Sequence, residues 1–107
     1  MASEIIQELS ELTAQNKRGV EALYEAEIDL AGAESDLDKA EAHAFISGAG
    51  SVAERQAHAK LACSELRFAR DVAKAKVNRI KVKLRGIESA IMAQATMSKI
   101  LQAEMKL

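Results

Sequence analysis

One glycine-rich break interrupts a chain that otherwise has the pattern of long helices. The break is Ser47-Gly48-Ala49-Gly50-Ser51, and the 107 residues contain no proline. Glycine is favoured just beyond the C-terminus of a helix because it adopts the left-handed conformation at little cost. Ser51 followed by Glu54 has the spacing of a capping box, which is typical of a helix start. The chain therefore has one place where it can turn back on itself.

These signals set the expected organisation of the chain. We expect a single all-α domain spanning residues 1–107, because a chain of this length supports at most one domain. Within it we predict a first helix at about 4–45, a turn at 46–51 and a second helix at about 52–105. The predicted fold is a long antiparallel helical hairpin resembling a coiled coil, which self-associates into a helical bundle because two helices enclose little interior.

Both predicted helices carry a seam of apolar or small residues at alternating spacings of three and four, as in a coiled coil. In the first helix the seam is Ile5, Leu9, Leu12, Asn16, Gly19, Leu23, Ala26, Leu30, Ala33, Leu37, Ala40 and Ala44. In the second helix it is Val52, Gln56, Ala59, Cys63, Leu66, Arg70, Ala73, Val77, Ile80, Leu84, Ile87 and Ile91. Folding the chain about Gly48 predicts a register in which Leu12 faces Leu84 and Asn16 faces Ile80, with Asn16 helping to fix either that register or the oligomeric state.

The distribution of charge supports this antiparallel pairing. Residues 1–45 carry eleven acidic and three basic side chains, whereas residues 46–107 carry five acidic and twelve basic ones. The acidic stretch 21–41 is predicted to face five cations of the second helix: Arg55, Lys60, Arg67, Arg70 and Lys74. We expect the guanidinium of Arg70, a seam residue, to reach Glu25, Glu27 or Asp29.

A second group of cations has almost no acidic counterpart in the predicted hairpin. Its members are Lys17, Arg18, Lys76, Arg79, Lys81, Lys83 and Arg85. Such a cluster can bind phosphates of DNA or RNA, or an acidic protein surface. The alternatives are a solvated flank or ion pairs to a second subunit. Aromatic side chains for stacking on bases are missing from the cluster, which argues against sequence-specific single-strand recognition.

Several apolar residues lie outside the predicted seam and form a candidate self-association surface. Tyr24, Ile28, Phe68 and Val72 are predicted to form a patch on one side of the hairpin. Beyond Ile91 the second helix outruns the first, so its apolar residues have no expected partner; among them are Met92, Met97, Ile100, Leu101 and Met105. Exposed apolar surface of this kind marks association with another chain.

No catalytic, metal or cofactor site is predicted. His43 and His58 lie near the turn but in different layers, and a metal site needs three or four convergent ligands. Cys63 is the only cysteine and fits a small apolar seam residue, and no disulfide within the chain can form. The carboxylates are spread along helices with no pocket to shift their pKa values, so we expect no enzyme activity and no small-molecule substrate.

Three stretches of the second helix resemble small helical-hairpin proteins of tailed phages and prophages. They are Ala53-Glu54-Arg55-Gln56-Ala57, residues 64–73 (SELRFARDVA) and residues 83–89 (KLRGIES). A Leu- and Glu-rich opening like Ile5 to Leu12 and a tyrosine in the first helix, like Tyr24, also recur in that group. The resemblance implies an early-region protein that acts in DNA metabolism or on host machinery, and it carries over no catalytic residue.

Together these patterns predict a non-enzymatic interaction protein, phage or prophage encoded, that binds a macromolecule through its basic end or its apolar C-terminal tail. Two alternatives stay open: a non-specific nucleic-acid-binding accessory protein in phage replication or recombination, and an inhibitor of a host defence or nucleic-acid enzyme. The expected partners are a second copy of the chain and either a host or phage protein or a nucleic acid. With neither a signal peptide nor a membrane span visible, we expect it in the cytoplasm of the cell.

Overall fold

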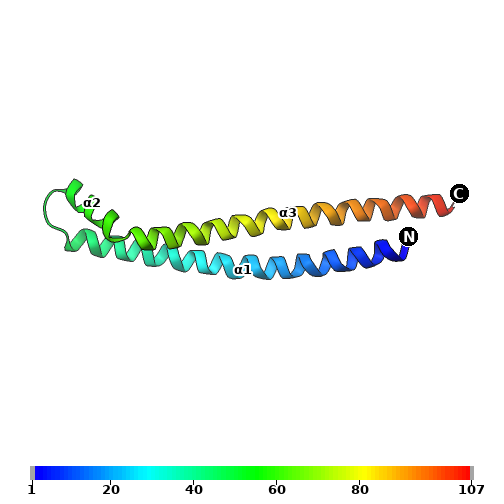
Figure 1. The fold of residues 1–107 in the computed structure, drawn as a ribbon, viewed down its shortest axis with the longest axis horizontal. Helices are drawn as coiled ribbons and strands as arrows, with labels where there is room; N and C mark the ends of the chain where they lie inside the picture. The colour runs from blue at the N-terminus through cyan, green and yellow to red at the C-terminus, as the bar shows by residue number, and fades with distance from the viewer. Residues whose placement is uncertain (1, 107) are drawn as a thin grey trace. The chain divides into compact units, whose positions relative to one another are not determined.

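The structure is a computed structural model that describes residues 2–106, and they form an all-helical hairpin. Helix α1 spans Ala2–Ser47, α2 spans Val52–Ala62 and α3 spans Ser64–Lys106. The chain groups into two compact units. The terminal unit contains Met1–Tyr24 and Arg79–Leu107, and the turn unit contains Glu25–Asn78. In each unit a segment of α1 runs antiparallel beside a segment of the second half of the chain (Figure 1).

The turn has the chemistry that the sequence predicts. Ser51 caps α2: its Oγ accepts a hydrogen bond from the backbone N–H of Glu54 at 3.2 Å. Gly50 has a φ of 99°, in the left-handed region, and a Cβ at this position would collide with the Glu54 carboxylate. Gly48 donates its N–H to the Phe45 carbonyl oxygen at 3.3 Å, which closes the last turn of α1. The capping box and the glycine break therefore both act at this turn.

The second half of the hairpin differs from the single helix that we predicted, because it divides at Cys63. This residue has φ −105° and ψ 15°, away from helical values, and separates α2 from α3. Its N–H still bonds to the Ala59 carbonyl at 3.0 Å, and its own carbonyl accepts from the Arg67 N–H at 2.9 Å. Hydrogen bonding thus continues through a local bend between α2 and α3, which is visible in Figure 1.

The predicted seam is the buried face of both halves. In the turn unit the buried side chains include Ala26 and Leu37 of α1 and Val77 of α3. Ile5, Leu84 and Ile87 are buried in the terminal unit. The spacing of three and four thus identified the correct faces. The main exception is the start of α2, where the predicted seam residues Val52 and Gln56 are exposed.

The predicted register is wrong by one heptad. Gly19 lies against Leu84, where the sequence register placed Leu12. A shift of one heptad keeps every seam residue on the seam, because the pattern repeats with the same period. The observed register lets α1 continue to Ser47 and leaves the start of α2 outside the seam. The absent side chain of Gly19 also provides room for the Leu84 side chain.

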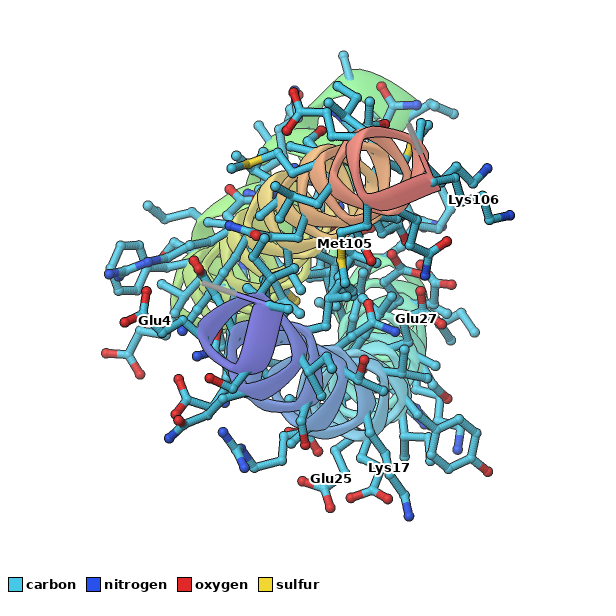
Figure 2. The ribbon with its side chains drawn as sticks, turned by 90° about the vertical axis from the view of Figure 1, so that its right-hand side faces the viewer. Glu4, Lys17, Glu25, Glu27, Met105 and Lys106 are labelled. Carbon is cyan, nitrogen blue, oxygen red and sulfur yellow. The ribbon has the colours of Figure 1, made fainter. Side chains whose placement is uncertain are left out.

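The observed register also changes the expectation that the second helix has no partner beyond Ile91. Leu101 is half-buried, and it lines a small hollow together with Ala2 and Ile5 of α1. Figure 2 shows Met105 extending from the end of α3 toward the side on which α1 begins, and it lines the same hollow. The segment from Met92 to Leu101 therefore has α1 as a partner within the terminal unit. Met92, Met97 and Ile100 remain exposed because they lie off the seam.

Candidate anionic-partner interface

Six of the seven predicted cations belong to the terminal unit. Arg79, Lys81, Lys83 and Arg85 occupy alternate positions of α3, and Lys17 and Arg18 lie on α1. Lys76 belongs to the turn unit. Residues two apart on a helix are rotated by about 200°. Arg79 and Lys83 therefore lie on one flank of α3, and Lys81 and Arg85 lie on the other.

Arg18 and Lys83 line one hollow between α1 and α3. Its volume is about 460 Å³. Gly19 and Ala22 line the α1 side and contribute almost no side chain, so Ile80, Leu84 and Ile87 of α3 form an apolar floor. Both cations are exposed. Lys17 is next to Arg18 but does not line the hollow, and in Figure 2 its side chain points away from α3. The hollow thus combines two positive charges with an apolar base.

The cations of the terminal unit form no ion pairs within residues 2–106. The two ion pairs found there both belong to the turn unit: Arg67 to Glu41 at 2.6 Å and Arg70 to Asp71 at 2.8 Å. No carboxylate of the described residues lies within 4.0 Å of the six basic side chains. Their charges are therefore available to an external anion, which we regard as the main electrostatic feature of the chain.

The two ion pairs of the turn unit show that the predicted partner of Arg70 is wrong and that Arg67 is the cation that pairs with α1. Arg70 does not reach Glu25, Glu27 or Asp29. It donates from Nε to Asp71, its neighbour in α3. Arg67 instead joins the two halves of the hairpin: it donates to Glu41 of α1 and, at 3.2 Å, to the Lys60 carbonyl oxygen of α2. Sequence reasoning placed Arg67 among five cations facing the acidic stretch but could not select it, since the choice depends on register.

Tyr24, Ile28, Phe68 and Val72 are exposed, but they do not form the single patch that we predicted. Tyr24 belongs to the terminal unit, whereas Ile28, Phe68 and Val72 belong to the turn unit. Ile28 follows the buried Ala26 by two positions, and Phe68 precedes the seam residue Arg70 by two. A rotation of about 200° turns Ile28 and Phe68 away from the partner helix. They consequently lie on the outer faces of different helices.

Sequence reasoning missed two features of the turn unit. Leu61 is an exposed apolar residue one heptad before Phe68, and that spacing was the signal that could have revealed it. The end of α1 and α2 also enclose a groove of about 850 Å³, with Phe45, Ile46 and Ala57 among its lining residues. Arg55 lies over the Phe45 ring, with its Cζ 6.0 Å from the ring centroid. The bend at Cys63 had no sequence signal that we recognised.

Residues 2–106 contain neither a cluster of metal ligands nor a membrane-spanning helix. Over residues 2–106 no group of three or more His, Cys, Asp or Glu side chains is arranged to hold a metal ion. Among the same residues, none of the helices has a segment apolar and long enough to cross a membrane. No protein-family model, curated protein or solved structure matches the chain. Functional inference therefore depends on the surface of the chain itself.

Proposed function

We propose that this chain is a non-enzymatic interaction protein that binds an anionic macromolecule through the basic surface of its terminal unit. The observation that carries the proposal is the set of six cations without an ion-pair partner in the described residues. Unpaired cations gathered on one unit raise the local potential and attract an anionic surface. The resemblance to phage hairpin proteins suggests the setting: a phage or prophage protein acting in the cytoplasm of its host.

Two observations favour binding over catalysis. The exposed surface offers positive charge and apolar side chains, which are features of association surfaces. The carboxylates lie along the helices, and in the described residues they form no cluster with histidine or cysteine that could hold a metal. An interaction role is consistent with both observations.

Non-specific binding of nucleic acid is the second candidate function. Lys81 and Arg85 lie on one flank of α3, and Arg79 and Lys83 lie on the other. Two rows of cations could therefore contact phosphates. The formal net charge of −1 for the whole chain weighs against a polyanion as the partner, because the acidic turn unit would repel it. Inhibition of a host defence or nucleic-acid enzyme would use the same basic surface against an acidic protein.

A capture experiment tests the proposal. The chain is immobilised and exposed to host lysate with and without nuclease treatment, in parallel with a triple variant, Arg79→Gln, Lys81→Gln and Lys83→Gln. A control variant with Lys39→Gln, Lys60→Gln and Lys74→Gln removes the same charge from the turn unit. We expect the first variant to lose, at low salt, a nucleic acid or protein that the wild type and the control retain. Identical capture by all three chains, together with self-association that the first triple variant leaves unchanged, would contradict the proposal.

A further inference from the structure

The chain has a large accessible surface for its mass. Its accessible surface is 8107 Å² for 11.6 kDa. Folded monomers of that mass expose about 5,800 Å², by the scaling of surface with mass. The difference of about 2,300 Å² exceeds the roughly 800 Å² that each partner buries in a standard interface. Among residues 2–106, fifteen large hydrophobic side chains are exposed and eight hydrophobic ones are buried, so much of this surface is apolar.

The hollow of the terminal unit suits an amphipathic occupant. Arg18 and Lys83 supply positive charge, and Ile80, Leu84 and Ile87 supply the apolar floor. A phosphate backbone is bound by cations alone and gains nothing from an apolar floor. A helix that carries a carboxylate beside apolar side chains uses both features, in the manner of a helix bound in a groove.

The turn unit of the same chain presents such a helix face. Glu65, Phe68 and Val72 follow one another in α3 at spacings of three and four, which places these three residues on one side of the helix. Phe68 and Val72 are 70% and 52% exposed. Glu65 forms no ion pair with any described residue. This surface of α3, the Phe68 face, combines one free carboxylate with two exposed apolar side chains.

We propose that the hollow at Arg18 and Lys83 binds the Phe68 face of a second copy of this chain. This inference rests on the proposed function, because it assigns the anionic partner of the basic surface. The apolar side chains of the Phe68 face cover Ile80 and Ile87, and Glu65 pairs with Arg18 or Lys83. The units have complementary charge: the terminal unit has eight basic and six acidic residues, and the turn unit has seven basic and ten acidic residues.

Sedimentation equilibrium of the full chain tests this interface. The variants are Arg18→Glu, Lys83→Glu and Phe68→Ala, each of which changes an exposed residue. Lys99→Glu is the matched charge control, because Lys99 is exposed in the terminal unit, lies outside the hollow and is not one of the six cations. Ile28→Ala is the matched apolar control, because Ile28 is exposed on the outer face of α1. Circular dichroism verifies that each variant keeps its helices.

We expect the three interface variants to weaken self-association by about tenfold or more, which corresponds to about 1.4 kcal/mol, and the two controls to leave it unchanged. The double variant Glu65→Arg with Lys83→Glu should restore association, because it exchanges the charges of one pair. A crosslinking experiment supports the contact independently of the stability of the variants. Phe68→Cys and Ala22→Cys chains, each in a Cys63→Ala background, are mixed and oxidised, and a disulfide between Cys residues of the two different chains is expected.

Binding of a fluorescent DNA duplex, measured on the same variants, separates the possible failures. If Arg18→Glu and Lys83→Glu abolish duplex binding but do not alter self-association, the partner is nucleic acid. That result overturns this inference and leaves the proposed function standing. If the variants alter neither self-association nor duplex binding nor capture from lysate, both proposals are wrong.

Discussion

Gly19 of α1 lies so close to Leu84 of α3 that a Cβ at position 19 would come within 2.5 Å of Leu84 Cδ2. This contact fixes the register of the terminal unit, because a residue with a side chain could not occupy the same place without moving Leu84. It also shapes the candidate interface, since the space above the glycine becomes part of the hollow between Arg18 and Lys83.

Replacing Gly19 and Gly86 by alanine should change stability in opposite directions. In Gly86→Ala the new Cβ meets nothing within 4 Å, so we expect about 1 kcal/mol of stabilisation from helix propensity. In Gly19→Ala the same gain is opposed by overpacking against the buried Leu84, which costs about 1–3 kcal/mol, so we expect a net loss. Urea denaturation at one protein concentration measures both changes. Equal stabilisation by the two substitutions would contradict the close approach.

The register itself is tested by paired cysteines. In a Cys63→Ala background, Gly19→Cys with Leu84→Cys should form a disulfide within one chain, because these residues face each other. Leu12→Cys with Leu84→Cys, which matches the register expected from sequence, should not. Mass spectrometry after mild oxidation identifies the products. The observed register is refuted if the second pair crosslinks and the first does not.

Asn16 should be a point of instability in the seam. Its side chain is half-buried, and Oδ1 has no hydrogen-bond partner in the described part of the chain. Leaving a buried acceptor unsatisfied costs about 1–3 kcal/mol, so we expect Asn16→Leu to raise the melting temperature. Gln15→Leu is the control, because Gln15 is exposed. A lower melting temperature for Asn16→Leu would show that the amide contributes more than it costs.

The ion pair between Arg67 and Glu41 should contribute modestly to stability. The side chains of Arg67 and Glu41 are 29% and 38% exposed, so solvent weakens the pair, and we expect Glu41→Gln to cost below about 1 kcal/mol. Glu34→Gln, a carboxylate without an ion pair in the described residues, should cost nothing. Thermal denaturation at low and high salt measures the difference, which should shrink as salt rises. A salt-independent difference would assign the effect to packing.

The buried faces of the helices could be predicted from sequence, but the register could not. Apolar residues at spacings of three and four specify which side of a helix is buried, and Ala26, Leu37, Val77 and Leu84 are buried as expected. The same pattern repeats every heptad, so it fits equally well after a shift of one repeat. The contact that decides the register, between Gly19 and Leu84, depends on how the Leu84 side chain fits against the glycine. The spacing of apolar residues does not reveal it.

The candidate site was partly predictable for a similar reason. The basic run of α3 is evident in the sequence, and six of the seven proposed cations do share the terminal unit. The hollow between Arg18 and Lys83 required the register, because its residues come from both halves of the chain. The pairing of Arg70 with Asp71 instead of an acidic residue of α1 depended on side-chain conformation, which spacing does not determine.

The salt dependence of binding tests the central claim most directly, namely that the cations of the terminal unit bind an anionic partner. Association is measured from low to high salt for two partners: a second copy, by sedimentation, and duplex DNA, by fluorescence anisotropy. We predict that at least one of these associations weakens steeply with salt. The dependence on salt should become weaker in the triple variant with Arg79→Gln, Lys81→Gln and Lys83→Gln. For DNA, each lost phosphate contact reduces the magnitude of the slope of log K against log salt by about 0.9. Association of both partners that is unaffected by salt and by these substitutions would contradict the claim.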